Sequence, residues 1–209
     1  MGTSPSFAST IRLLADRWAG AGMLLSGFAL LSRGRPLESE EFAAVSGVPV
    51  ETLSEALDAA RCERDARGRL VDLYGLSLAP TLHRLEIGGR SLFSCCALWA
   101  HVIPKLVDRQ VTIESIDPVR RSLVRLSVSP QRVESTDPLG AVATIAVATP
   151  EAINADVGVA FCSQVRHFES RESAEEFAAE RPACQVLTLE ELQGAADQLH
   201  EAIWSAASP

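Results

Sequence analysis

The cysteines of this 209-residue chain are the residues whose type and position point most directly to chemistry. Cys95 and Cys96 are adjacent and open a segment with helical periodicity, and Cys162 follows further along the chain. A cysteine at the start of a helix faces the positive end of the helix dipole and free backbone N–H groups, which lower its pKa and favour the thiolate. Cys96 is therefore the best-placed nucleophile by position. The alternative, that Cys95 and Cys96 are small buried apolar residues, stays open.

Other sequence patterns for catalysis are missing from the chain. It has no glycine-rich phosphate loop, no paired CxxC motifs and no HExxH motif. The four histidines are far apart in the sequence and give a histidine-rich metal site little support: His83, His101, His167 and His200. Cysteine chemistry is the main hypothesis that remains.

The composition describes a globular protein with enough apolar residues for a core, at 47% hydrophobic and 22% charged. It excludes a disordered, collagen-like or disulfide-dense protein. Five cysteines cannot all pair as disulfides, which favours free thiols in a reducing cytoplasm. A net charge of −8 argues against general nucleic-acid binding. The most apolar segment, residues 19–31, is shorter than the roughly 20 residues of a membrane span. We therefore expect a cytoplasmic protein without a membrane partner.

Helical patterns dominate the amino-terminal third of the chain. Apolar residues recur at helical spacing through residues 11–31, and two shorter helices are expected on either side of a stop at Gly47. Together with a turn signal at residues 65–68, they form the outline of a helix-turn-helix with a small hairpin or wing. We expect residues 1–80 to form a helical, winged-helix-like domain.

The pattern changes after Pro80, where strands are expected on both sides of Gly88-Gly89, followed by a helix from Cys96 to Val107. Further strands are expected at residues 111–116, 123–128, 131–135, 141–148 and 186–188, and further helices at residues 173–180 and 189–204, the first with Ser173 and Glu176 at capping-box spacing. Helices followed by a strand-rich body indicate an α+β protein. Residues 81–209 are expected to form its mixed β-sheet body with packed helices.

The cysteine segments resemble those of the organomercurial (alkylmercury) lyases. Residues 92–98, Leu-Phe-Ser-Cys-Cys-Ala-Leu, followed by Pro104, are similar to the first cysteine segment of that family. Residues 161–165, Phe-Cys-Ser-Gln-Val, ending at Phe168, are similar to its second. Further matches follow in the same order at residues 33–36, around Gly68, at 74–78 and at 126–130. The ordered set covers most of the chain.

The resemblance implies cleavage of a carbon–mercury bond by protonolysis, which releases a hydrocarbon and Hg(II). Cys96 would attack mercury first and Cys162 would be the second thiolate, because thiolates bind soft metals far better than carboxylates do. Phe93, Cys95 and Trp99 would line the pocket for a small organometallic substrate. No organic cofactor would be needed, and cellular thiols or a mercuric reductase would accept the Hg(II).

One position departs from the family pattern. Members usually carry an acidic residue three positions after the first cysteine, and this chain has Trp99 there. An indole N–H cannot exchange a proton near neutral pH. Asp117 is the candidate proton donor if the fold brings it near Cys96, and Cys95, His101 and His167 are other donors.

Two further hypotheses stay open beside an active lyase. A thiol metal-binding protein on the same fold, or one with another substrate, is favoured by Trp99. A winged-helix transcriptional regulator would use the amino-terminal module. Cys62 and Cys184 are expected bystanders. Every hypothesis that uses Cys96 and Cys162 as a pair requires their sulfurs to converge on one metal atom.

Overall fold

The structure, a computed structural model, describes residues 6–17, 22–59, 62–73 and 75–207. Its helices are α1 (Phe7–Arg17), α2 (Gly22–Leu31), α3 (Ser39–Ser46), α4 (Val50–Ala59), α5 (Ala97–Leu106), α6 (Pro150–Ala160), α7 (Arg171–Ala179) and α8 (Leu189–Ala207), with a 3-10 turn η1 (Cys162–Gln164). Its strands are β1 (Asp72–Leu73), β2 (Leu76–Ser77), β3 (His83–Ile87), β4 (Arg90–Ser94), β5 (Val111–Ile116), β6 (Leu123–Val128), β7 (Val133–Asp137), β8 (Val142–Ala146), β9 (His167–Phe168) and β10 (Cys184–Thr188). The α+β class expected from the sequence is confirmed.

Two antiparallel sheets carry the strands of the described residues. The larger has the order β1-β2-β4-β3-β5-β6-β7 and the smaller the order β10-β8-β9. The sequence led us to expect a mixed sheet, but all the pairings described here are antiparallel. Short connections account for the β1–β2, β3–β4, β5–β6 and β6–β7 pairs, because a parallel pair needs a long crossover.

Alternating side chains give the large sheet one core-facing side. In β3, His83, Leu85 and Ile87 are buried while the residues between them are exposed, and β5 buries Val111, Ile113 and Ser115 in the same way. Because side chains alternate across a strand, the two polar residues His83 and Ser115 point into the core with the apolar ones. They also lie opposite one another in the β3–β5 register.

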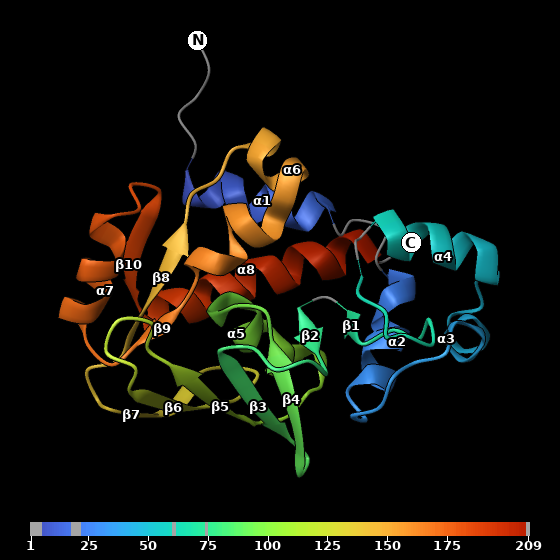
Figure 1. Ribbon diagram of the computed structural model, residues 1–209, viewed down its shortest axis with the longest axis horizontal. Coiled ribbons are helices and arrows are strands. Elements are labelled where there is room, and N and C mark those ends of the chain that lie inside the picture. Colours follow the sequence, from blue (N-terminus) through green and yellow to red (C-terminus); the bar gives the residue numbers. More distant parts are fainter. Residues whose placement is uncertain (1–5, 18–21, 60–61, 74, 208–209) are drawn as a thin grey trace.

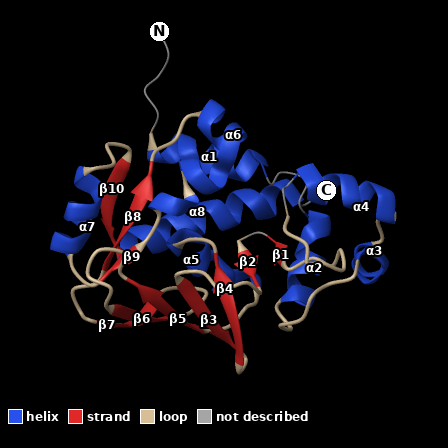
Figure 2. Cartoon of the chain, in the orientation of Figure 1, coloured by secondary structure: helices blue, strands red, loops and turns tan. Residues whose placement is uncertain are grey.

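Helices cover the core-facing side of this sheet (Figure 1). Helix α5 packs on β3 and β4, and α8 packs against α5. Helices α1 and α6 lie on the other side of α8 from the large sheet, and α7 packs beside the small sheet (Figure 2). Helix α8 therefore connects the amino-terminal helices with the sheet body.

The amino-terminal helices largely follow the sequence prediction. Helix α3 ends at Gly47, whose φ of 70° is left-handed and whose N–H donates to the carbonyl of Ala43, and α4 follows. An isolated bridge pairs Arg64 with Leu70 around the predicted turn. Strand β1 joins the large sheet through β2 and β4. The winged-helix comparison and the division at residue 80 stay predictions.

Two helix starts differ from the prediction. Helix α6 was not expected, although Thr149 accepts a hydrogen bond from the Ala152 N–H and Pro150 occupies the first turn, both typical of a helix start. Helix α7 begins after Ser170, whose side chain accepts from the Ser173 N–H, so Ser173 is not the cap. Among the described residues, no helix is both long and apolar enough to cross a membrane.

Candidate metal centre

Cys95 and Cys96 connect the end of β4 to the start of α5. Cys96 is the N-cap of α5 and has extended backbone angles, φ −156° and ψ 168°. The Cys95 N–H donates to the Gly75 carbonyl at 3.0 Å, and the Ser94 hydroxyl donates to the Cys96 carbonyl at 3.0 Å. Both cysteines are thus held through their own backbone groups.

Cys162 lies in η1, directly after α6. The Thr144 hydroxyl on β8 donates to the Gln164 carbonyl at 2.7 Å, which fixes this segment against the small sheet. The Ala97 N–H at the start of α5 donates to the Val165 carbonyl at 3.0 Å. This last bond joins the two cysteine segments directly, although they are far apart in the sequence.

The fold brings three sulfurs together. The Sγ atoms of Cys95, Cys96 and Cys162 all lie within 4.8 Å of one another, and this is the one such group among the described residues. Cys95 Sγ lies 3.7 Å from Cys162 Sγ. Cys96 is fully buried and the other two are partly exposed. The convergence of Cys96 and Cys162 that the pair hypothesis requires is present.

The three thiols differ in acidity. Burial raises the pKa of Cys96, but hydrogen bonds from the thiols of Cys162 and Cys95, the Trp99 backbone N–H and the charge of Arg166 outweigh it and hold this pKa well below its usual value. The pKa of Cys95 is raised by its hydrogen bonds to Cys162 and Cys96 and by burial. The hydrogen bond from Cys95 lowers the pKa of Cys162, but Cys96 and burial raise it overall. Among the three sulfurs, Cys96 is the one whose thiolate form is most favoured.

Arg166 connects this cluster to a buried polar network. Its Nε donates to the Ser163 carbonyl, next to Cys162, at 3.1 Å, and its Nη1 lies 3.3 Å from His83 Nε2. The guanidinium is therefore fixed from two sides. Its positive charge favours the thiolate form of Cys96 and of Cys162.

The three histidines that the sequence separates lie side by side in this network. Ser115 Oγ is 2.8 Å from His83 Nδ1 and 2.8 Å from His167 Nδ1, and His167 Nε2 is 3.2 Å from His101 Nε2. His101 Nδ1 lies 2.9 Å from Gln193 Oε1. All five side chains are buried. Sequence reasoning missed this cluster because it depends on the pairing of β3 with β5 and on the position of β9.

Hydrogen bonding allows one arrangement of protons in the network. Arg166 can only donate, so His83 accepts at Nε2 and donates from Nδ1 to Ser115. At the other end the Gln193 carbonyl oxygen can only accept, so His101 donates from Nδ1 and accepts from His167 at Nε2. The Ser115 hydroxyl then donates to His167 Nδ1. Each histidine is neutral, in agreement with burial, which lowers the pKa of His83 to about 3 and of His101 to about 4.

The other predicted site residues lie around or away from the cluster. Trp99 is 2% exposed in the core, and its indole lies against Gly75. Phe93 is half-buried on β4. Asp117 is buried, and its carboxylate accepts hydrogen bonds from the backbone of Val119, Arg120 and Glu169 and from the Ser173 hydroxyl. These bonds lower its pKa against the effect of burial, which favours a structural carboxylate over a proton donor.

The remaining two cysteines lie outside the three-sulfur cluster. Burial raises the pKa of Cys62 to about 12, and Cys184 Sγ is 3.4 Å from the side-chain oxygen of Gln164.

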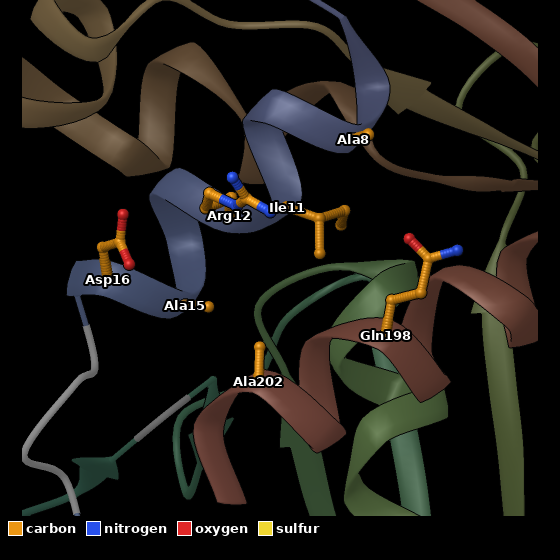
Figure 3. A pocket seen from close by; sticks show the side chains of 7 residues that line it. All are labelled: Ala8, Ile11, Arg12, Ala15, Asp16, Gln198 and Ala202. Atoms are coloured by element: carbon orange, nitrogen blue, oxygen red, sulfur yellow. The ribbon is translucent and has the colours of Figure 1, made fainter. Parts of the chain in front are cut away.

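A cleft of about 350 Å³ between α1 and α8 contains no thiol (Figure 3). Its lining residues are Ala8, Ile11, Arg12, Ala15, Asp16, Gln198 and Ala202.

Comparisons with known proteins point to one family. The family profile described as MerB, alkylmercury lyase, matches residues 76–201. The chain is 38% identical to the alkylmercury lyase of Staphylococcus epidermidis over 78% of its own length and 74% of that protein. It is 32% identical to the alkylmercury lyase of Streptomyces lividans over 86% of its length and 82% of that protein.

The fold is shared with a solved structure. A crystal structure of the mercury-bound form of MerB2 superposes with a TM-score of 0.78 at 18% sequence identity, covering 92% of this chain and 98% of that one. Neither a regulator nor a purely metal-binding protein is favoured by these matches. The family profile matches more than half of the chain, and the match to the Staphylococcus epidermidis protein extends over most of both sequences. This chain therefore belongs to the alkylmercury lyase family.

Proposed function

We propose that this protein cleaves the carbon–mercury bond of small organomercurial compounds by protonolysis, with Cys96 and Cys162 as the working pair. The observation that carries the proposal is the convergence of their sulfurs within one cluster, in a chain of this family. Thiolate sulfur suits mercury because both are soft. No group other than these side chains is required for the chemistry.

The first step is ligand exchange at mercury. The Cys96 thiolate attacks the metal of R–Hg–X, forms a sulfur–mercury bond and releases X⁻. Cys96 is suited to this step because the hydrogen bonds and the Arg166 charge described above lower its pKa and favour the thiolate. The product of this step is a protein-bound S–Hg–R group.

The second step transfers a proton to carbon. When the sulfur of Cys162 binds mercury, its thiol proton passes to the carbon, the carbon–mercury bond breaks and R–H leaves. One thiolate and one thiol at the start thus become two sulfur–mercury bonds, and the balance requires no carboxylic acid. Such a reaction is compatible with Trp99 at the position where the family resemblance implies an acid, and it leaves Asp117 to hold the β9–α7 connection.

The Hg(II) product has to leave through ligand exchange with other sulfur compounds. We propose cellular thiols or a mercuric reductase as acceptors, and a reducing compartment such as the cytoplasm, because the cluster works only with its thiols reduced.

Hydrocarbon release from phenylmercury by the reduced protein tests the proposal. Benzene measured by gas chromatography should appear with the wild-type protein and with Cys184→Ser, whose sulfur lies outside the cluster. Cys96→Ser and Cys162→Ser should release none and should lose tight Hg(II) binding. A wild-type protein that binds Hg(II) tightly but releases no benzene would contradict the lyase function, and equal damage from Cys184→Ser would contradict the choice of the pair.

A further inference from the structure

We propose that Cys95 is a third sulfur ligand, so that Hg(II) is held by three sulfurs instead of the two that cleavage requires. That the ion is the product of carbon–mercury cleavage rests on the proposed function. The three-sulfur site itself can be tested with Hg(II) added in solution. Cys95 follows from geometry alone, because its sulfur belongs to the same cluster as Cys96 and Cys162.

The distances suit one ion between three sulfurs. Three sulfurs arranged trigonally around an ion, each at the zinc–thiolate bond length of about 2.3 Å, are about 4 Å apart, and a longer bond to a larger ion widens this slightly. The Cys95 and Cys162 sulfurs are 3.7 Å apart, and all three pairs are within 4.8 Å. Binding therefore requires small side-chain movements and no rearrangement of the backbone.

Backbone contacts already hold Cys95 in place for this role. Its N–H is bound to the Gly75 carbonyl, and its neighbour Cys96 is fixed by Ser94 and by the first turn of α5. The hydrogen bond from the Ala97 N–H to the Val165 carbonyl holds the segment that contains Cys162 next to the start of α5. Since all three sulfurs are preorganised, little conformational entropy is lost when the ion binds.

Charge is also balanced at the site. Hg(II) with two thiolates is neutral, and the third sulfur loses its thiol proton to a buffer base when it binds, which leaves one net negative charge. The Arg166 guanidinium lies beside the Cys162 segment, anchored on the Ser163 carbonyl and on His83, and can compensate that charge. A third thiolate in a buried site without such a cation would be costly.

The consequence for the reaction concerns the product. An ion held by three thiolates is retained more strongly than one held by two, so release depends on competing thiols. The site also discriminates, because ions that accept three soft ligands gain from Cys95 while hard ions bind none of the three.

Mercury-edge X-ray absorption on the reduced full-length protein loaded with one equivalent of Hg(II) tests the proposal. The wild-type protein and Cys184→Ser should show three sulfurs, and Cys95→Ser two sulfurs at a shorter distance. In competition with a dithiol chelator, Cys95→Ser should bind Hg(II) more weakly by about 100-fold or more, because loss of even an outer-shell partner costs roughly 10–100-fold.

The wild-type spectrum decides even if Cys95→Ser fails to fold. Two sulfurs in the wild-type protein would overturn the third ligand, and benzene release from phenylmercury would then show that the proposed function stands without it. Three sulfurs together with no benzene release would support the third ligand and contradict the lyase function. Equal chelator resistance in Cys95→Ser and wild type would also overturn the proposal.

Discussion

At Gly75, beside the three-sulfur cluster, the addition of a single methyl group is expected to lower both the stability of the fold and the affinity for Hg(II). Its φ of 71° lies in the left-handed region, and a Cβ built there would be 2.4 Å from Cγ of Trp99. Trp99 is 2% exposed, so its indole cannot move out into solvent without leaving the core. The Gly75 carbonyl also holds the N–H of Cys95. We therefore predict that Gly75→Ala destabilises the fold and disturbs the three sulfurs together.

Gly47 provides a matched control for the magnitude. Its φ is 70°, nearly the same, but a Cβ there would meet nothing within 4 Å. Gly47→Ala should cost only the left-handed backbone term, about 1–2 kcal/mol. Gly75→Ala adds overpacking of about 1–3 kcal/mol, for a total of about 2–5 kcal/mol. At ~2–4 °C per kcal/mol for a chain of this size, Tm should fall by ~2–8 °C for Gly47→Ala and by ~4–20 °C for Gly75→Ala.

Thermal and urea unfolding of both variants, with Hg(II) affinity measured on the folded proteins, checks this prediction. Gly47→Ala should bind Hg(II) as the wild type does, and Gly75→Ala more weakly. A double-mutant cycle with Trp99→Leu should give a favourable coupling energy, because the smaller side chain makes room for the methyl group. Equal costs for the two glycine variants, or additive effects in the cycle, would refute the clash with Trp99.

Three further predictions concern other parts of the structure. The folded-state pKa values of His83 and His101, about 3 and about 4, lie below the usual value of about 6.5, so the unfolded state binds more protons below that pH. The free energy of unfolding, from urea titrations, should therefore fall as pH drops from about 6.5 toward 4, by up to ~1.4 kcal/mol per pH unit for each histidine, and a flat profile would contradict the buried neutral network. Asp117→Ala should lower the unfolding free energy by at least ~1–3 kcal/mol, because it leaves buried donors unpaired, while the folded protein keeps its benzene release; loss of turnover at full folding would restore Asp117 as a proton donor. Trp99→Asp should lower Tm sharply, since truncating a buried aromatic alone costs about 3–5 kcal/mol, and a stable variant with raised activity would show instead that the family acid is the limiting group.

The longer strands and most helices could be predicted from the sequence because their signals are local, whereas the two-residue strands β2 and β9 were not expected. Strands β5 and β6 begin and end at the predicted residues, since alternating apolar side chains and Asp-Pro or Ser-Pro turns mark them. Helix α3 ends at the predicted glycine. Helix α6 was not predicted, although Thr149 and Pro150 carry a helix-start signal.

The site was predictable only in part. The family resemblance singled out Cys96 and Cys162. Cys95 joins their cluster because its N–H bonds to the Gly75 carbonyl and because the Ala97 N–H bonds to the Val165 carbonyl, and no local sequence pattern indicates these two bonds. The histidine cluster depends on strand register and on β9 lying beside β5, which are long-range properties. Trp99 was expected to line the substrate pocket. Its packing against Gly75 depends on the turn between β1 and β2, which the sequence around Trp99 does not indicate.

The buried histidine network beside Arg166, with its single arrangement of donors and acceptors, bears on where the protons of the reaction can come from. Each of its three imidazoles has one N–H and one lone pair, and every one is already used. An extra proton on His101 would set its new N–H against the N–H of His167, and one on His83 would set its new N–H against Arg166, each a donor–donor contact in a buried site. Protonation of the network at either end is therefore opposed by a neighbouring donor, which agrees with a reaction that takes its proton from the sulfur side.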